Sequence, residues 1–401
     1  MTRLLRPRRR TLRPSTLLGA CLVALLAAGA APARSAAQAV PARLADSTFW
    51  RLMKEMSEPG GTFRSENFVS NETSLQWVIP ELQRTIRPGG VYLGVAPDQN
   101  FTYIGAVRPA IAFIVDIRHQ NAMQHLMYKA LVETSATRAE FLAKLFSRAP
   151  LAGVDTTASA EQLFAALERH PPDSVRFLAN LQAITDHLVR THRFALSDSE
   201  LVSLGCVYGM FFTAGPALTY SHSSECNDGF LFRRGAMGMR MPTYQAMLTE
   251  TDSAGVNWSY LGSEARYRAL REMQQRNLIV PLTGNFAGDR ALRAVGQWAR
   301  ERGAKVTTFY VSNVEQYLFM EGDDARRFYE NVATLPTDST STFIRSYSGG
   351  RFGGFDGGLV LKQQSLSGRS LQLMSGIQEQ LRAFRDGQVT SWIDVIRISR
   401  Q

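Results

Sequence analysis

Residues 91–121 read VYLGVAPDQNFTYIGAVRPAIAFIVDIRHQN and carry the clearest structural pattern of the chain. The predicted elements are a strand at 90–94, a turn at 96–98, a helix from Asn100 to Pro109, a strand at 110–115 and a helix at 119–133. The second strand, AIAFIV, is a continuous apolar run, which is typical of a parallel strand buried on both faces. This succession predicts right-handed strand–helix–strand units.

The same alternation returns after residue 277. Further strands are predicted at 278–282, 305–311, 341–344 and 392–398, and helices at 289–302, 323–333 and 371–386. Pro281 predicts the end of its strand or a bulge, because proline cannot donate a ladder hydrogen bond. The glycine-rich residues 345–358 predict a surface loop, with a lid or anion-binding loop as the alternative.

The stretch between the two halves is mostly helical by its apolar spacing. Its predicted helices lie at 138–147, 160–169, 173–191, 197–212 and 264–276, with a long loop at 213–241. We therefore expect an α/β fold with a largely parallel, Rossmann-like sheet and a large helical insertion at about 135–275. We expect residues 40–401 to form a single domain.

The first 39 residues have the layout of a secretory signal peptide. Arginines at the start are followed by an uncharged run at 15–33 and by small-residue cleavage sites at 31–33 and 37–39. This predicts export to the periplasm or cell envelope, by the general secretory route or, through RRRTL at 8–12, by the twin-arginine route. An uncleaved N-terminal anchor is the alternative, since about 18 apolar residues can span a bilayer.

Charge and cysteine content limit the partners. The net charge of +10 includes seven arginines of the first 39 residues, so the rest carries only +3, and no nucleic-acid partner is expected. Membrane contact is expected only through an uncleaved N-terminal segment. Cleavage would leave Cys206 and Cys226, which an oxidising compartment allows to pair, and free buried thiols are the alternative.

The strand–turn–helix unit offers a candidate cofactor site. Gly94 lies in the turn, Asp98 and Asn100 lie where the helix begins, and Asp116 ends the next strand, 22 residues after Gly94. Open α/β sheets bind ligands beyond the carboxyl ends of their strands, and an acid at this spacing can bind ribose hydroxyls. The pattern predicts a nucleotide- or nucleoside-type pocket for a small-molecule ligand, with a structural turn and a helix-capping Asp as the alternative.

This order of elements resembles class I S-adenosylmethionine-dependent methyltransferases. More narrowly, residues 92–121, NLIVPLTGNFAG at 277–288 and FYVSNVEQYLF at 309–319 resemble an uncharacterised bacterial family that includes a Leptospira protein. That family is assigned by fold to the methyltransferase-like superfamily, and the resemblance covers about residues 45–347. It implies a methyltransferase-like sheet, S-adenosylmethionine as the candidate cofactor, Gly94 as the glycine that admits it and Asp116 as the ribose-binding acid.

Departures from the superfamily pattern lead to a second hypothesis. Tyr92 and Leu93 stand where an acid is usual, Gly94 is the one glycine of the turn, and TGNF at 283–286 replaces an Asn-Pro-Pro-Tyr-like motif. The first hypothesis is methyl transfer to an unknown acceptor. The alternative is a non-catalytic envelope binding or scaffold protein that retains the fold without the cofactor.

Candidate catalytic residues follow the later strands. Asn285, Asn313 and Glu315 are expected at the sheet edge that carries Gly94, and Glu315 would be a general base if burial raised its pKa. The alternative is that all three are hydrogen-bonding loop residues. Arg118 is expected to pair with Asp116 or to clamp an anion. The six histidines include no i,i+4 pair, so no metal site is predicted.

Overall fold

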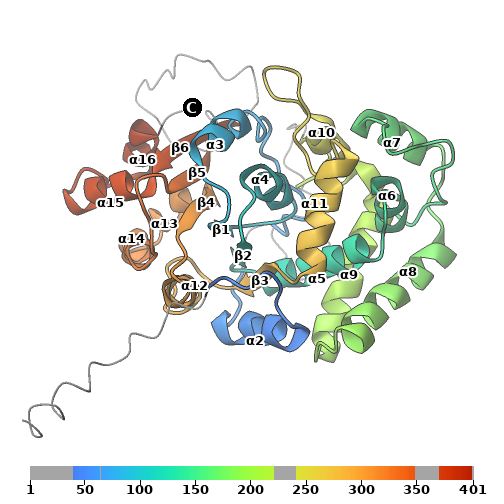
Figure 1. Cartoon of the computed structure of the whole chain (residues 1–401), viewed down its shortest axis with the longest axis horizontal. Coiled ribbons are helices and arrows are strands. Elements are labelled where there is room, and N and C mark those ends of the chain that lie inside the picture. The colour runs from blue at the N-terminus through green and yellow to red at the C-terminus, as the bar shows by residue number, and fades with distance from the viewer. Residues whose placement is uncertain (1–38, 64, 221–240, 348–369, 400–401) are drawn as a thin grey trace, which may run out of the picture. The chain divides into compact units, whose positions relative to one another are not determined.

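The computed structural model describes residues 39–63, 65–220, 241–347 and 370–399 (Figure 1). Six strands form one sheet in the order β3-β2-β1-β4-β5-β6. They are β1 (Val91–Gly94), β2 (Ile111–Asp116), β3 (Ile279–Thr283), β4 (Val306–Ser312), β5 (Thr342–Tyr347) and β6 (Leu371–Gly376). Strands β1 to β5 are parallel and β6 is antiparallel to β5, which confirms the expectation of a largely parallel α/β sheet.

The strand order reverses direction at β1. From β1 the chain adds β2 and β3 on one side, and it then returns to add β4 and β5 on the other. The point between β1 and β4 is therefore a topological switch point, where open α/β sheets bind their ligands. The candidate residues around Gly94 lie beside it, at the carboxyl end of β1.

The prediction that Pro281 ends its strand or forms a bulge is wrong. This residue lies in the middle of β3 with regular pairing to Ile114, so it neither ends the strand nor forms a bulge. The physical reason is the position of β3 at the edge of the sheet, where a missing N–H removes no ladder partner on the open side.

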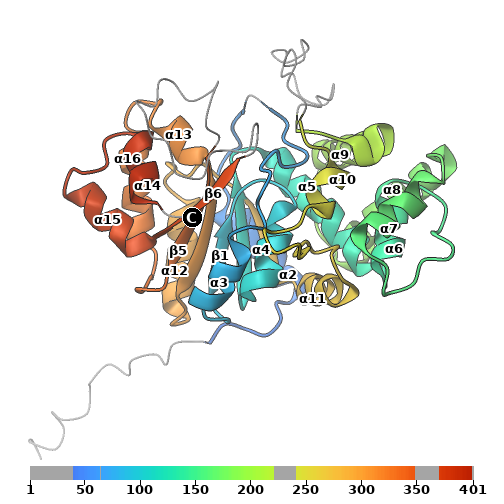
Figure 2. The same cartoon turned by 90° about the horizontal axis from the view of Figure 1, so that it is seen from above.

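The helical insertion between β2 and β3 is confirmed. After α5 (His119–Glu133), which follows β2, its helices are α6 (Arg138–Leu145), α7 (Ala160–Glu168), α8 (Ser174–Asp186), α9 (Asp198–Ala214), α10 (Tyr244–Thr249) and α11 (Glu264–Gln275), with a π-helical turn η1 (His187–Thr191) after α8 and a 3-10 turn η2 (Gly215–Ala217) after α9. Ser159 and Ser197 form capping boxes that start α7 and α9. Figures 1 and 2 show α6 to α9 on the side of the molecule away from β6.

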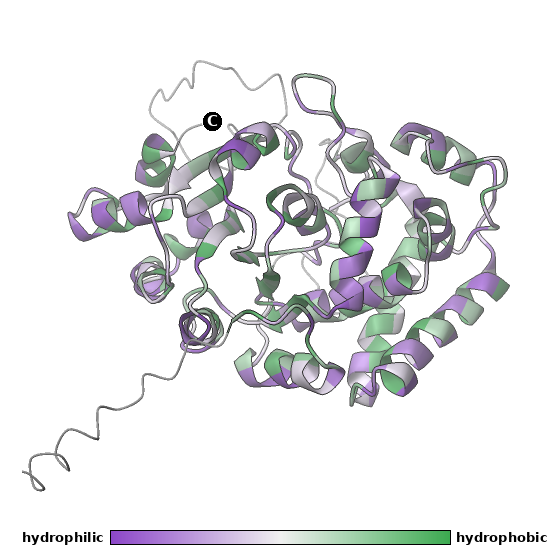
Figure 3. Cartoon of the chain, viewed as in Figure 1, coloured by the Kyte–Doolittle hydropathy of each residue, from purple (hydrophilic) through white to green (hydrophobic). Residues whose placement is uncertain are grey.

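The remaining helices border the sheet. They are α2 (Asp46–Met56), α3 (Ile79–Thr85), α4 (Gln99–Val107), α12 (Ala291–Glu301), α13 (Val314–Leu318), α14 (Asp324–Ala333), α15 (Ile377–Arg385) and α16 (Trp392–Ile398). Figure 3 shows hydrophilic and hydrophobic residues interspersed along the outer helices. In α12 the buried side includes Leu292, Val295 and Ala299, an i, i+3, i+7 pattern that packs one stripe inward.

Near the C-terminus, one prediction is correct only in its second part and another is wrong. The predicted helix at 371–386 is β6 followed by α15, and the predicted strand at 392–398 is α16. Pairing with β5 makes residues 371–376 a strand, while Ser391 accepts a hydrogen bond from the Asp394 N–H and so caps a helix. Leu373 and Ile396 then meet in one small apolar cluster.

Several sequence features lie outside the described residues. They are most of the targeting segment at 1–39, residues 221–240 of the predicted loop, and residues 348–358 of the glycine-rich stretch. Cys206 on α9 is disulfide-bonded. Residues 39–401 cluster as one compact unit. Among the described helices, none combines the length and the apolar character needed to cross a bilayer.

Candidate functional site

The turn after β1 is filled by the side chain of Asn100. Its Nδ2 donates to the carbonyl oxygens of Val95 (2.8 Å), Ala96 (3.1 Å) and Pro97 (2.7 Å). Its Oδ1 accepts a 2.8 Å hydrogen bond from the hydroxyl of Tyr92. Asn100 is completely buried, so one amide holds the whole turn from the inside.

Gly94 is required by this arrangement. A Cβ atom on Gly94 would lie 1.9 Å from Asn100 Oδ1 and 2.7 Å from Tyr92 Cε1. Real side chains do not approach so closely, and a larger residue would displace the amide. The close approach that the sequence assigned to a cofactor is made in this structure by the protein's own Asn100.

Asp98 lies at the start of α4 and faces a cluster of tyrosines. Its Oδ2 accepts a 2.8 Å hydrogen bond from Tyr260, whose hydroxyl lies 2.7 Å from that of Tyr244. Burial raises the pKa of Asp98 to about 6, although the hydrogen bond from Tyr260 opposes the rise. Asp98 therefore has an internal partner and makes no side-chain cap on α4.

Replacing Asp98 with asparagine is expected to stabilise the protein at neutral pH and not at acidic pH. In the folded state the pKa of Asp98 is raised to about 6. The stability of the wild type is therefore complete at a pH below the pKa that Asp98 has in the unfolded chain, and it falls as the pH rises through the folded-state pKa. Each pKa unit corresponds to about 1.4 kcal/mol, so the gain of D98N over wild type should grow by about 2–3 kcal/mol between about pH 4 and about pH 8. Urea unfolding at both pH values measures this, and an equal difference at both would contradict it.

Asp116 is paired within the chain. The Arg118 backbone N–H and Nε donate to Asp116 Oδ1 at 2.9 and 3.0 Å, and Arg118 Nη2 donates to Oδ2 at 2.9 Å. Both side chains are buried. The predicted ion pair is thus confirmed, and both carboxylate oxygens that would bind ribose already have donors. Arg118 Nη1 also donates to the carbonyl of Glu66.

An N-terminal segment crosses the carboxyl ends of the strands. We call residues 57–63 and 65–73 the edge segment. The Glu58 N–H donates to the carbonyl of Thr283, the last residue of β3, at 2.8 Å. The Gly61 N–H donates to the carbonyl of Ile117, just after β2, at 2.8 Å. The first half of the edge segment therefore covers the ends of the two strands farthest from β6.

The second half of the edge segment reaches β4 and β6. Glu72 is buried and accepts hydrogen bonds from Tyr310 (2.6 Å) and Ser312, both on β4. Burial raises the pKa of Glu72, although these hydroxyl donors oppose the rise. The Ser370 hydroxyl, just before β6, donates to the Thr73 carbonyl at 2.6 Å. A further buried acid, which the sequence analysis did not single out, thus lies beside the switch point.

Glu315 belongs to a buried ion pair rather than to an open site. Arg345 Nε and Nη2, from β5, donate to its two oxygens at 2.5 and 3.1 Å. The Tyr329 hydroxyl donates to Glu315 Oε1 at 2.6 Å. With both oxygens engaged and both partners buried, the contacts support a structural role and not that of a general base.

Asn285 and Asn313 make local hydrogen bonds. Asn285 Oδ1 accepts from the Ala287 N–H at 3.0 Å, and Asn313 Nδ2 donates to Gln316 Oε1 at 3.4 Å. Asn285 follows β3, which lies two strands from β1, or about 10 Å at the usual strand spacing. All three candidate catalytic residues thus follow the carboxyl ends of β3 and β4, at the sheet edge that carries Gly94, as expected. Their side chains are already engaged, the two asparagines by neighbouring residues and Glu315 by a buried ion pair.

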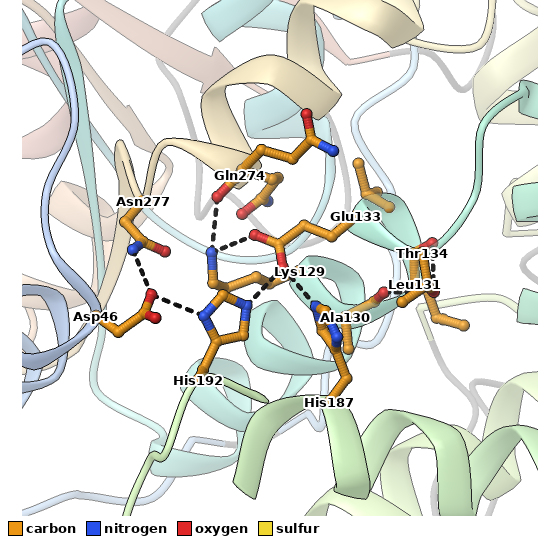
Figure 4. Close-up of polar contacts among 12 residues, drawn as sticks. Asp46, Lys129, Ala130, Leu131, Glu133, Thr134, His187, His192, Gln274 and Asn277 are labelled. Atoms are coloured by element: carbon orange, nitrogen blue, oxygen red, sulfur yellow. Dashed lines mark hydrogen bonds and ion pairs between the residues drawn. The ribbon is translucent and has the colours of Figure 1, made fainter. Parts of the chain in front are cut away.

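A cluster that the sequence analysis missed joins α5 to the π-helical turn (Figure 4). His187 Nε2 and His192 Nε2 lie 2.7 and 2.6 Å from the same oxygen, Oε2 of Glu133. Lys129 Nζ donates to the other oxygen of Glu133 at 2.5 Å. Burial opposes ionisation of Glu133, but hydrogen bonds from the two histidines and the Lys129 charge hold its pKa well below the ordinary value.

The spacing of these histidines explains why no sequence pattern predicted this cluster. They are five residues apart, whereas an α-helix places residues four apart on one face. The π-helical turn η1 changes which residues share a face, and no sequence pattern predicted this turn. The structure thus brings together one carboxylate and two imidazoles, with ligand atoms that all lie within 4.8 Å of one another.

The fold and the site together define an α/β protein in which the protein's own side chains occupy the region beside the topological switch point. The chain belongs to the family described as "Domain of unknown function (DUF7790)", whose model matches residues 67–192 and 229–397. No curated protein matches the chain. The matched segments include Gly94, Asp116, Glu133, His187 and His192, whereas the first half of the edge segment lies outside them.

Proposed function

We propose that this protein is an exported envelope protein that retains a methyltransferase-like, Rossmann-like fold and uses it as a binding or scaffold domain without S-adenosylmethionine. The observation that carries the proposal is the position of Asn100. Its amide occupies the space over Gly94 and bonds to three turn carbonyls, where a cofactor would need room.

The other candidate cofactor residues support the same proposal. The carboxylate of Asp98 is held by Tyr260, and that of Asp116 is held by Arg118. The edge segment adds backbone and side-chain hydrogen bonds along the carboxyl ends of β2, β3 and β4. A ligand at this edge would have to displace these contacts and desolvate the groups that make them, which lowers its net affinity.

The predicted export also supports a role without S-adenosylmethionine. A cleaved signal peptide would place the domain outside the cytoplasm, where S-adenosylmethionine is made. Twin-arginine export of a folded protein, or an anchor that keeps the domain inside, would restore access to the cofactor. The N-terminal segment therefore matters to the function as much as the site does.

Methyl transfer is the second candidate function. Strand order favours it, since the sheet reverses between β1 and β4 and carries Gly94 and Asp116 at neighbouring carboxyl ends. Methyl transfer depends mainly on positioning of donor and acceptor, so it does not require a general base such as Glu315. In this case Asn100 would have to leave the turn when the cofactor binds.

Calorimetric titration of the full chain with S-adenosylmethionine and S-adenosylhomocysteine distinguishes the two functions. The protein is first denatured and refolded to remove any carried ligand, and its fold is checked by circular dichroism. We expect no binding heat with either compound. Micromolar binding that is lost in Asp116→Asn would contradict the proposal and establish the cofactor site, and the question would then be the methyl acceptor.

A further inference from the structure

The cluster around Glu133 is built from three separate parts of the chain. Glu133 and Lys129 come from α5, His187 opens η1, and His192 follows it. Asp46, the first residue of α2, contributes a second carboxylate (Figure 4). The cluster is independent of the sheet edge discussed above, and the proposed function does not use it.

The π-helical turn orients both imidazoles toward one point. The His192 N–H donates to the His187 carbonyl at 3.0 Å, the i to i+5 hydrogen bond that defines this helix type. The two rings meet edge to face, with centroids 4.8 Å apart and planes at 86°. Single π-helical turns are frequent at functional sites, because they change which side chains share a face.

We propose that Glu133, His187 and His192 bind a zinc ion. The ligand atoms are Oε2 of Glu133 and Nε2 of each histidine, the three atoms that already converge in this structure. Two imidazoles and one carboxylate form a donor set that zinc accepts in tetrahedral geometry, with the fourth position left to water or another ligand. Other divalent transition metals share this preference and are the competitors.

Asp46 supplies the hydrogen-bond acceptor that a metal-binding histidine usually has on its other ring nitrogen. Its Oδ1 lies 2.8 Å from His192 Nδ1 and accepts a 2.7 Å hydrogen bond from Asn277 Nδ2. A carboxylate on Nδ1 fixes the ring orientation and leaves Nε2 to face the metal. Both ring nitrogens of His192 face carboxylates in this structure. Zinc would bind the unprotonated Nε2, so a proton held there would pass to solvent.

Size and access are compatible with this ion. Zinc ligands lie about 2.0–2.1 Å from the metal, which separates tetrahedral ligand atoms by about 3.3 Å. The present contacts of 2.6 and 2.7 Å would thus widen by less than about 1 Å. Glu133 is almost fully buried, but the His187 side chain is 20% exposed, which gives the ion an approach from solvent.

Lys129 determines how Glu133 would bind. Its ammonium contacts Oε1, which leaves Oε2 as the single oxygen directed at the histidines. The Lys129 charge repels a cation, whereas the carboxylates of Glu133 and Asp46 attract it. We therefore expect zinc affinity in the micromolar range. The competing explanation is a metal-free network of buried charges, in which the same contacts serve packing alone.

The test is zinc titration of the full chain after treatment with a chelator. We expect one zinc ion per chain by calorimetry. Asp46→Asn should weaken binding by about 10–100-fold, the usual effect of changing the hydrogen-bond partner of a metal ligand. His187→Gln should weaken it more, because it removes a ligand from a partly exposed position. His170→Gln, which lies outside the cluster after α7, should leave binding unchanged.

A second readout separates loss of a ligand from loss of the fold. Circular dichroism and thermal unfolding of the metal-free variants must match those of the metal-free wild type. Cobalt(II) added in place of zinc should give the intense visible absorption of tetrahedral coordination, which H187Q abolishes. A folded wild type that binds no zinc, or H187Q binding as tightly as wild type, overturns the proposal and leaves the charge network.

Discussion

Replacing Arg345 with methionine is expected to lower the free energy of unfolding by about 3–5 kcal/mol. Arg345 and Glu315 are both fully buried, and the guanidinium contacts both carboxylate oxygens. Without it, Glu315 would keep only the Tyr329 hydroxyl as a side-chain partner among the described residues and would remain as an uncompensated charge in the interior. Urea unfolding of the variant and the wild type measures the difference.

Two further variants make this prediction specific. Arg51→Met removes an exposed i,i+4 pair with Glu55 on α2 and should cost less than about 1 kcal/mol. The double variant E315L/R345M removes both buried charges, so it should be closer to wild type than R345M alone. If R345M were no more damaging than Arg51→Met, the pair would not be the buried structural element described above.

Replacing Asn100 with alanine is expected to lower the free energy of unfolding by about 3 kcal/mol or more. The change leaves the carbonyls of the turn without their shared donor and the buried Tyr92 hydroxyl without its acceptor. Thr102→Val is the matched control, because Thr102 is buried on the same helix and its hydroxyl has no hydrogen-bond partner among the described residues. That variant should be close to neutral.

Gly94 provides the coupled variant. Gly94→Ala alone should cost about 1–3 kcal/mol, because the added methyl group meets the Asn100 amide. In the double variant G94A/N100A the methyl group enters space that Asn100 has left. The losses of unfolding free energy in the two single variants should therefore add up to more than the loss in the double variant. Strict additivity in urea unfolding would mean that Asn100 does not occupy the Gly94 turn in solution.

Local signals in the chain predicted most of the sheet. The segment 91–133 carried its own turn residues and a continuous apolar strand, so β1, α4, β2 and α5 appear where they were expected. The failures came where tertiary pairing overrides local preference. Residues 371–376 become a strand only because β5 lies beside them, and residues 392–398 become a helix through the Ser391 cap.

The candidate site was less predictable, because its partners come from distant segments. Residues at the correct edge were identified, among them Gly94, Asp98 and Asp116. Nothing near Gly94 in the sequence revealed that Asn100 would fill the turn, or that Tyr260 would engage Asp98 from 162 residues away. The Glu133 cluster depends on a π-helical turn, which shifts residue spacing in a way that periodicity does not anticipate.

The edge segment has a consequence for the order in which the molecule folds. Glu72 can form its hydrogen bond with Ser312 only after the chain has grown by 240 residues, and Thr73 can bond to Ser370 only after it has grown by 297 residues. During synthesis or translocation from the N-terminus, this segment emerges long before its partners, and contacts between such distant residues form late and slowly. The Glu72 carboxyl therefore lacks its partners until β4 has been made, and the Thr73 contact must wait until residue 370 has been made, which places closure of the sheet edge late in folding.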